Sequence, residues 1–259
     1  DKPTIYYPLT TVMLAGIQDI LIITTPHEEA LFKQLLKDGS QWGLNIEYAI
    51  QEQPKGIADA FIIGEKFIGN DNVFLILGDN IIHGHNLAND LPDAAEKNQG
   101  ATVFCFKVKD PERYGVVDLD ADGKVIGVVE KPSDPPSNWA ITGLYILDST
   151  VSDIAAGLTP SARGELEMVD VIGDYLERGA LSVEKLGRGY AWLDSGTHES
   201  LLDAAQYIAT IEQRQGLKIA CLEEIALRKG FIDLVAFKVL AENYPNSSYG
   251  KYLRTLLED

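Results

Sequence analysis

Short apolar runs alternate with longer amphipathic segments over the first 108 residues, and this alternation restricts the chain to few folds. Short runs rich in β-branched residues predict strands, and the segments between them carry the periodicity of helices. Strands are predicted at residues 19–25, 44–51, 73–77 and 101–108, and helices at residues 27–39, 56–68 and 87–98. Such spacing is typical of right-handed βαβ units. The sequence therefore predicts an α/β fold with a doubly wound, Rossmann-like mixed sheet.

The rest of the chain departs from this rhythm. Residues 115–132 read as two strands around Asp122 and Gly123, a strong hairpin signal. Further strands are predicted at residues 139–147, 181–186 and 190–194, helices at 165–180 and 198–214, and short helices from Cys221 onward. We therefore expect an α/β domain over residues 1–216 and a helical C-terminal extension over residues 217–259, packed on that domain.

The charge balance excludes one class of partner. The chain has 259 residues, is 46% hydrophobic and carries a formal net charge of −17, so it can form a substantial core but has no basic surplus for a nucleic-acid backbone. A phosphorylated substrate would need a few placed cations and a divalent metal. Cys105 and Cys221 fit no zinc or disulfide pattern and are expected to be free, buried thiols. Because no apolar run reaches 18 residues and no leader is present, we expect no membrane partner and a cytoplasmic location.

Two aspartates follow apolar, strand-like runs. Asp79 comes after residues 73–77, which are predicted to form a strand buried on both faces, and Asp194 ends the stretch YAWLD. Ligands of such sheets bind outside the carboxyl ends of the strands. Mg²⁺ prefers oxygen ligands and usually takes one or two protein carboxylates, so this pair would suffice. The alternative is a helix N-cap or loop role, especially for Asp194, which precedes a helix.

Other candidate residues lie at strand and helix ends. Glu130 and Lys131 should point to opposite faces of a strand, so a mutual ion pair is not expected; Lys131 could reach a phosphate and Glu130 sugar hydroxyls, or both could be solvated charges. Arg163 precedes an acidic helix start, where a phosphate would also meet backbone amides. Gln51 can read a nucleobase edge and Gly56 allows close approach of a planar base. His83 and His85 have no evident third ligand.

Taken together, these motifs resemble those of the sugar-nucleotide pyrophosphorylases, most closely the glucose-1-phosphate thymidylyltransferases of the dTDP-rhamnose pathway. The resemblance runs through nearly the whole chain. It is carried, in order, by DKPTIYYPL, MLAGI, LGDNIIHGH, DPERYGVV, EKP, RGELEMVDV, LERGALSVEKLGRGYAWLDSGTHESLL, IEQRQGLKIACLEEIA and YGKYL. It implies attack of glucose 1-phosphate on the α-phosphorus of dTTP, which gives dTDP-glucose and pyrophosphate, with Mg²⁺ as cofactor.

The resemblance also implies roles for particular residues. Asp79 and Asp194 would hold the magnesium ion, and Asp79 would also face the nucleotide. Lys131 and Arg163 would bind the sugar phosphate and stabilise the charge that develops at phosphorus. The remaining assignments are Gln51 and Gly56 to the thymine base, Tyr114, Gly115 and Glu130 to the sugar, and Gly84, Glu224 and Arg228 to a regulatory dTDP-sugar site. A homotetramer is the expected assembly.

One element of the family pattern is missing from the sequence. Members open with a strand and a glycine-rich loop of the form GGxGTRLxP, and this chain begins after it. The resemblance implies that about thirty N-terminal residues are absent from the sequence, judged by the size of a βα unit, and that the core has a gap. Two alternatives remain open: uridylyl transfer, since thymine and uracil differ by one methyl group, and a catalytically inactive nucleotide-sugar-binding subunit.

Overall fold

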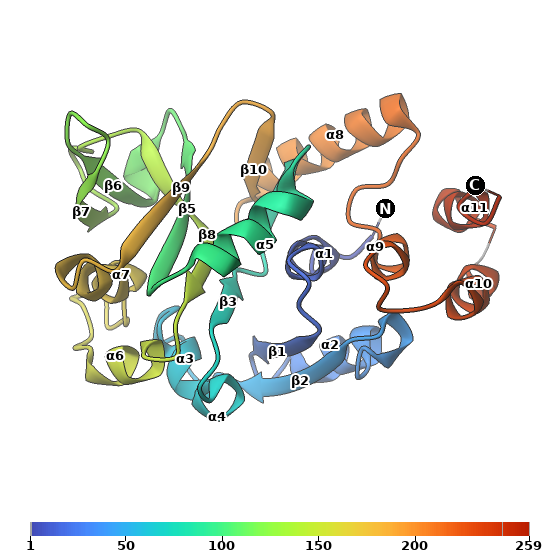
Figure 1. The fold of residues 1–259 in the computed structure, drawn as a ribbon, viewed down its shortest axis with the longest axis horizontal. Coiled ribbons are helices and arrows are strands. Elements are labelled where there is room, and N and C mark those ends of the chain that lie inside the picture. The colour runs from blue at the N-terminus through green and yellow to red at the C-terminus, as the bar shows by residue number, and fades with distance from the viewer. Residues whose placement is uncertain (1, 245, 259) are drawn as a thin grey trace.

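A computed structural model describes residues 2–244 and 246–258, which form a mixed α/β fold (Figure 1). The main sheet has the strand order β7-β6-β8-β5-β9, and β3 also pairs with β8. Only β5 and β9 pair in parallel within it. The strands are β3 (Val73–Ile76), β5 (Ala101–Lys107), β6 (Gly115–Leu119), β7 (Val125–Glu130), β8 (Trp139–Leu147) and β9 (Leu181–Leu186).

Two further pairs of strands lie beside the main sheet. β1 (Asp19–Thr24) and β2 (Asn45–Ile50) are parallel, whereas β4 (Asn80–Gly84) and β10 (Tyr190–Asp194) are antiparallel. β4 was not predicted, because only Leu77 and the polar turn of Gly78 and Asp79 separate it from β3. The hairpin of β6 and β7 around Gly123 is confirmed.

The helices differ from the prediction at three places. The predicted helix 56–68 is divided at Gly64 into α3 (Asp59–Ile63) and α4 (Glu65–Ile68), α6 (Val151–Gly157) was not predicted, and the predicted helix 165–180 begins only at Met168. The other helices are α1 (Tyr6–Leu14), α2 (Glu29–Leu36), α5 (Leu87–Lys97), α7 (Met168–Glu177), α8 (His198–Gln215), α9 (Leu222–Arg228), α10 (Leu234–Asn243) and α11 (Ser248–Thr255), with short 3₁₀ turns η1 (Ser40–Trp42) and η2 (Pro111–Arg113).

Alternating side chains of the main sheet form two cores. Val103 and Tyr145 point toward α6 and α7, where Tyr175 is completely buried. Phe104 and Leu144 belong to a second cluster with α5. Because neighbouring residues of a strand face opposite sides, one sheet is covered by helices on both faces. This arrangement confirms the predicted Rossmann-like class.

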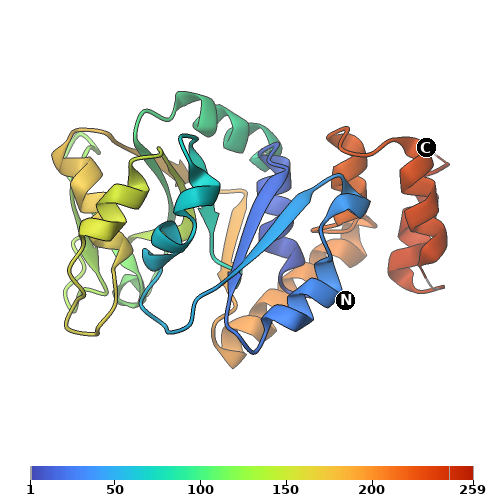
Figure 2. The same cartoon turned by 90° about the horizontal axis from the view of Figure 1, so that it is seen from below.

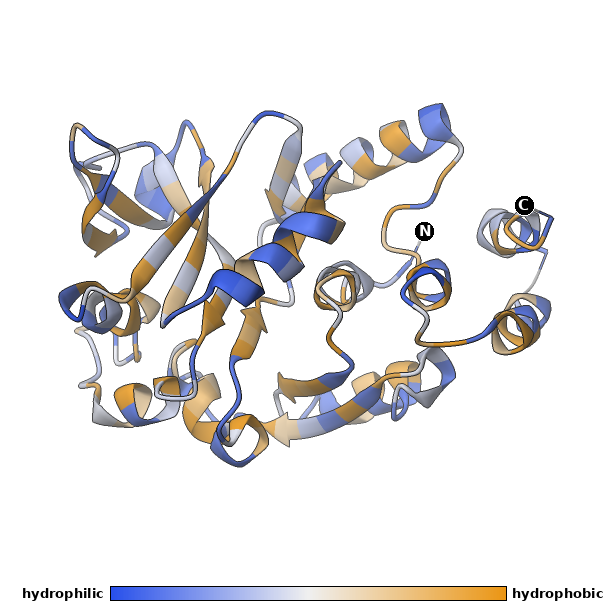
Figure 3. Cartoon of the chain, viewed as in Figure 1, coloured by the Kyte–Doolittle hydropathy of each residue, from blue (hydrophilic) through white to orange (hydrophobic). Residues whose placement is uncertain are grey.

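An apolar groove of about 810 Å³ lies between β1 and β3. Residues 20–23 of β1 and residues 73–76 of β3 line it, and both strands are predominantly hydrophobic (Figure 3). β3 is only partly buried along its length, so the prediction that it is buried on both faces was wrong. β3 pairs with β8, but its residues also line this groove, which leaves them partly exposed. A gap in the core was expected from the family resemblance.

The C-terminal helices α9 to α11 lie at the opposite end of the molecule from the β6 and β7 hairpin (Figures 1 and 2). Glu223 of α9 is completely buried and accepts hydrogen bonds from Trp42 Nε1 at 3.0 Å, Tyr244 Oη at 2.6 Å and Tyr249 Oη at 2.5 Å. These donors come from η1 and from the chain around α10 and α11. Glu223 therefore ties the C-terminal helices to the α/β region.

Cys105 and Cys221 are free and buried, as predicted. Burial is the main cause that raises the pKa of each thiol to about 12, which keeps both protonated at neutral pH. Within residues 2–244 and 246–258, no helix has the length and apolar character required to cross a bilayer.

Candidate active site

A cavity of about 250 Å³ opens where β7 and β10 end and β4 begins, near the start of α7. Its walls come from segments far apart in the sequence. Seven of the predicted site residues line it: Asp79, Tyr114, Gly115, Glu130, Lys131, Arg163 and Asp194. The fold thus brings together both predicted metal ligands and all five residues assigned to the sugar phosphate.

The pairing of β4 with β10 sets the positions of Asp79 and Asp194. Asp194, the last residue of β10, lies opposite Asn80, the first residue of β4, and Asp79 directly precedes Asn80 in the adjoining turn. Ser195 joins the two turns, because its backbone N–H and its hydroxyl both donate to the Asp79 carbonyl, at 3.0 and 2.7 Å. The two carboxylates are therefore held at the same edge of the cavity by backbone geometry.

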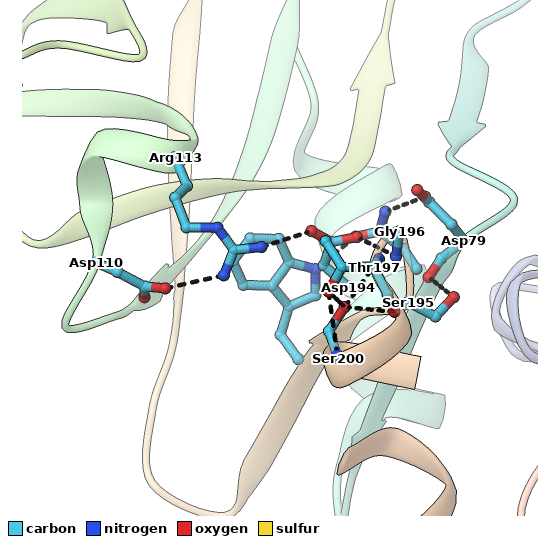
Figure 4. A network of polar contacts seen from close by, with 10 residues as sticks. Asp79, Asp110, Arg113, Asp194, Ser195, Gly196, Thr197 and Ser200 are labelled. Atoms are coloured by element: carbon cyan, nitrogen blue, oxygen red, sulfur yellow. Dashed lines mark hydrogen bonds and ion pairs between the residues drawn. The ribbon is translucent and has the colours of Figure 1, made fainter. Parts of the chain in front are cut away.

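Both carboxylates converge on Gly196 (Figure 4). A Cβ atom at Gly196 would lie 3.0 Å from Asp194 Oδ1 and 3.4 Å from Asp79 Oδ2, so the absence of a side chain leaves a space edged by two anionic oxygens. Two hard oxygen donors from separate elements are a fitting partial ligand set for Mg²⁺, whose other ligands are usually water and substrate phosphates. The described residues contain no group of three or more metal-binding side chains.

The alternative role of Asp194 as a helix cap is not the arrangement in the structure. Thr197 is the N-cap of α8: its hydroxyl accepts from the Ser200 N–H at 3.2 Å, and Ser200 Oγ accepts from the Thr197 N–H at 3.1 Å. Asp194 Oδ1 accepts instead from the Gly196 N–H at 2.9 Å. Its other oxygen remains directed toward the cavity side of the turn, where Arg113 lies (Figure 4).

Glu130 and Lys131 form an ion pair, with 3.7 Å between Lys131 Nζ and Glu130 Oε1. The expectation that neighbouring strand residues would not pair was wrong, because β7 ends at Glu130 and Lys131 has a left-handed φ of +41°. This backbone conformation is uncommon for a residue with a Cβ atom and is often found at functional sites. Burial raises the pKa of Glu130, although the charges of Lys131 and Arg163 oppose that effect.

Arg163 is oriented by Glu167. Its Nη2 and Nε atoms donate to the two oxygens of Glu167 at 2.7 and 3.1 Å, and Ser161 Oγ donates to the same carboxylate at 2.7 Å. Burial disfavours the charged form of Glu167, but these hydrogen bonds outweigh it and lower its pKa. Glu167 directly precedes α7, so the loop from residue 161 to residue 167 places the guanidinium near the N-terminus of that helix. Bidentate pairing of this kind fixes both position and direction.

Gln51 and Gly56 lie in a neighbouring loop and are not among the described residues that line the cavity. Gln51 Nε2 donates to Asp59 Oδ2 at 2.9 Å and to the Gly56 carbonyl at 3.2 Å. Gly56 has a φ of +98°, and a Cβ there would lie 2.5 Å from the Leu166 carbonyl. Close backbone approach is therefore observed at Gly56, but the approaching group is the loop that carries Arg163.

Sequence reasoning did not assign Arg113, Tyr145 or Trp192, which also line the cavity. Trp192 donates from Nε1 to Asn80 Oδ1 at 2.5 Å and packs on Tyr114 with 4.9 Å between ring centroids. The period of a strand offered one signal, because Trp192 lies two residues before Asp194 and therefore shares its face. Tyr145 is buried inside a continuous apolar strand, which offered no such signal.

The three predicted regulatory residues lie on two elements that both pack against α1. Gly84 ends β4 beside Tyr190, whose ring atom Cδ1 would lie 2.2 Å from a Cβ at this position. On α9, Arg228 Nε pairs with Glu224 Oε1 at 2.8 Å, and Tyr252 donates to the same carboxylate. This region is separate from the cavity lining.

Comparisons with known proteins give a consistent family. The model of the family described as Nucleotidyl transferase matches residues 1–211. The chain is 57% identical over 256 residues to the glucose-1-phosphate thymidylyltransferase of Xanthomonas campestris pv. campestris, covering 99% of this chain and 87% of the relative. It is 50% identical over 258 residues to the enzyme of that name from Mycobacterium tuberculosis, covering 100% of this chain and 89% of the relative.

Solved structures agree with the sequence relatives. A structure titled as a glucose-1-phosphate thymidylyltransferase from Bacillus anthracis, in complex with a sucrose, has a TM-score of 0.73 at 37% identity and covers 79% of this chain and 82% of that chain. A UDP-glucose pyrophosphorylase complexed with UDP-glucose has a TM-score of 0.71 at 25% identity, covering 81% and 87%. The chain belongs to the nucleotidyl transferase family and, within it, to the glucose-1-phosphate thymidylyltransferases.

Proposed function

We propose that the cavity joins a thymidylyl group from dTTP to glucose 1-phosphate, giving dTDP-glucose and pyrophosphate. An oxygen of the sugar phosphate attacks the α-phosphorus of the nucleotide, and the bond from that phosphorus to the pyrophosphate breaks. The observation that carries this proposal is the convergence of Asp79 and Asp194 at one edge of a cavity whose walls also include Lys131 and Arg163. Such transfers depend mainly on positioning and on charge neutralisation.

Asp79 and Asp194 are the residues that would hold Mg²⁺. When bound, the ion supplies positive charge to the phosphates of the nucleotide. The protein's part is to keep two carboxylate oxygens beside Gly196, where a Cβ atom would crowd the Asp194 oxygen at 3.0 Å. Asn80 contributes by donating from Nδ2 to Asp79 Oδ1 at 2.8 Å, which leaves Asp79 Oδ2 for the ion.

The opposite wall suits a sugar phosphate. Lys131 and Arg163 offer cations for the phosphate, and Glu130 offers a carboxylate that accepts from sugar hydroxyls. At Gly115, a Cβ would lie 3.3 Å from Glu130 Oε2, so glycine keeps the space beside that carboxylate open. Tyr114 adds an aromatic surface next to it, which suits a sugar ring.

We assign the base to the loop with Gln51 and Gly56, outside the cavity lining. Gln51 already makes two intramolecular hydrogen bonds, so recognition of thymine by its amide requires exchange of at least one of them. Uridylyl transfer is the closest alternative, favoured by the structural similarity to a UDP-glucose pyrophosphorylase. A single methyl group discriminates by only about 1 to 3 kcal/mol.

Pyrophosphate release tests the activity directly. The purified protein receives glucose 1-phosphate, Mg²⁺ and either dTTP or UTP, and the Asp194→Asn variant serves as the comparison. Fastest release with dTTP, abolished by a chelator and strongly reduced in the variant, is the expected result. Faster release with UTP would favour the uridylyl alternative, and no release with either nucleotide would favour a catalytically inactive nucleotide-sugar-binding subunit.

We further propose that a dTDP-sugar effector binds near Gly84, Glu224 and Arg228 of a homotetramer in the dTDP-rhamnose pathway. The Arg228 side chain is largely exposed although it is paired with Glu224, so an anionic ligand could replace that partner. Inhibition by dTDP-rhamnose that is lost in Arg228→Ala while turnover persists would support this assignment. Sedimentation of the protein as a monomer would contradict the tetramer.

A further inference from the structure

Arg113 lies between two carboxylates at the edge of the cavity (Figure 4). It ends η2, and its Nη1 atom donates to Asp110 Oδ2 at 2.9 Å within the same turn. Its Nη2 atom lies 3.7 Å from Asp194 Oδ2, on a strand about eighty residues away in sequence. The guanidinium also lies over the Tyr114 ring, 5.2 Å from the centroid. Arg113 thus connects the sugar side of the cavity to the predicted metal side.

The two oxygens of Asp194 have different partners. Oδ1 accepts from the Gly196 N–H, while Oδ2 faces the Arg113 guanidinium. A divalent ion bound by Asp194 and Asp79 would compete with Arg113 for the negative charge of the same carboxylate. Two cations cannot both approach one carboxylate closely without repelling each other.

Another cation can replace Arg113 as the partner of Asp194. The Arg113 and Asp110 side chains are 42% and 41% exposed, whereas Asp194 is 23% exposed. The guanidinium keeps its shorter bond to Asp110 if Asp194 is taken by another cation, so its release leaves no charge without a partner. Ion pairs of exposed side chains are weak, and the contact with Asp194 is the longer of the two, 3.7 Å against 2.9 Å, so it is the one that gives way.

We propose that Arg113 is the internal counter-cation of Asp194 in the metal-free protein and competes with the divalent metal for that carboxylate. The proposal rests on the proposed role of Asp79 and Asp194 as metal ligands. Arg113 acts through Asp194 and is a positioning residue. The consequence is that the site selects the metal–nucleotide complex over the free metal ion. A metal ion alone binds weakly, whereas one that arrives with a nucleoside triphosphate gains additional contacts that offset the displacement of Arg113.

Binding of Mn²⁺, followed by its electron paramagnetic resonance signal without nucleotide or sugar, measures this competition. Arg113→Gln is expected to bind Mn²⁺ about threefold to fivefold more tightly than the original protein, the range that an exposed ion pair supports. Arg178→Gln is the matched control for net charge, since Arg178 is equally exposed and pairs with Asp174 on α7. Arg113→Lys retains the charge and should restore most of the original affinity.

A second variant should change the affinity for Mn²⁺ in the opposite direction. Asp110→Asn removes the other partner of Arg113, so the guanidinium turns more fully to Asp194 and Mn²⁺ binding should weaken. Asp174→Asn is its control, because it removes one carboxylate from the pair on α7. Adding dTTP should reduce the difference between Arg113→Gln and the original protein, because the nucleotide then contributes to holding the ion.

Two results separate this proposal from the one on which it rests. If Arg113→Gln binds Mn²⁺ no more tightly than Arg178→Gln, the role of Arg113 as a competing cation is overturned. If Asp194→Asn and Asp79→Asn both bind Mn²⁺ as well as the original protein, the metal site itself is wrong. Thermal unfolding of each variant by circular dichroism verifies that these comparisons concern folded proteins.

Discussion

Two groups of carboxylates, one in the C-terminal helices and one in the cavity, are partnered in opposite ways. Glu223 is completely buried, and two tyrosines and a tryptophan donate to it at short distances. Asp79 and Asp194 each have an oxygen that faces the space beside Gly196, and the ion-pair partner of Asp194 is 3.7 Å away. The comparison teaches that a carboxylate with short hydrogen bonds to both oxygens stabilises the fold, whereas one held by a single hydrogen bond, with at most a longer ion pair, is available to a ligand.

Asp194→Asn should have the largest effect on activity and little effect on the fold. The amide keeps an oxygen that accepts from the Gly196 N–H but loses the charge that a metal ion requires. Because removal of one electrostatic stabiliser typically costs roughly 100- to 1000-fold in turnover, we expect a decrease of that size in pyrophosphate release. Urea unfolding should give nearly the original free energy. Unchanged turnover would contradict the metal assignment.

Glu223→Ala should instead act on stability. It removes the acceptor of the buried Trp42 and Tyr249 and of the partly buried Tyr244, and we expect the free energy of unfolding to decrease by about 3 kcal/mol. The control is Glu242→Ala on α10, whose side chain is exposed and weakly paired with Lys238, and which should change stability by less than about 0.5 kcal/mol. Equal effects of the two substitutions in urea unfolding would remove the distinction drawn above.

The sequence was sufficient to predict the class of fold and most of the elements, because apolar periodicity records which faces are buried. It failed where a short element depends on tertiary contacts. β4 pairs with β10, which is more than one hundred residues away, and no local pattern records that partner. The division between α3 and α4 at Gly64 was also missed, because one glycine inside an apolar periodic segment is compatible with an unbroken helix.

The site was predicted unevenly for the same physical reason. Residues at the ends of predicted strands, such as Asp79 and Asp194, could be proposed from position alone and do line the cavity. The partners that orient them could not, because the pairing of Arg163 with Glu167 and of Arg113 with Asp194 depends on loop conformation. Lys131 shows the limit most clearly, since its left-handed backbone reverses the expectation for neighbouring strand residues.

Glu167→Gln sharpens the comparison within the cavity. Glu167 has hydrogen bonds from Arg163 and Ser161, so it resembles Glu223 in being fully engaged, yet its partner is a proposed substrate-binding cation. Loss of its charge should free Arg163 and raise the KM for glucose 1-phosphate roughly tenfold, the size expected for a hydrogen bond to a charged group, with a smaller change for dTTP.

Glu165→Gln provides the control for that experiment. Glu165 lies 3.5 Å from the same Arg163 nitrogen but is more exposed than Glu167 and is not a bidentate partner. We expect a change of less than about twofold in the KM for glucose 1-phosphate, as for a weak surface pair. If both substitutions raise this KM equally, the orientation of Arg163 does not depend on the short pair with Glu167.

Glu130→Gln should have the smallest effect, and its dependence on pH identifies the cause. Burial raises the pKa of Glu130 in the folded protein, so the folded state holds the proton more tightly than the unfolded state does. The stability that this contributes is fully present below the unfolded pKa and is lost as the pH rises through the folded pKa. Ionised Glu130 therefore lowers the free energy of unfolding at pH 7, and the neutral glutamine removes that cost.

We expect Glu130→Gln to be more stable than the original protein at pH 7 by about 0.5 kcal/mol, and the difference to shrink as the pH is lowered toward 4, in urea unfolding at each pH. Affinity for glucose 1-phosphate should fall in the same variant. A stability difference that is constant with pH would mean that proton binding is not its cause. A gain in stability together with a loss of sugar affinity would show that Glu130 differs from Glu223. The charge of Glu130 would then serve ligand binding and destabilise the fold, whereas Glu223 stabilises it.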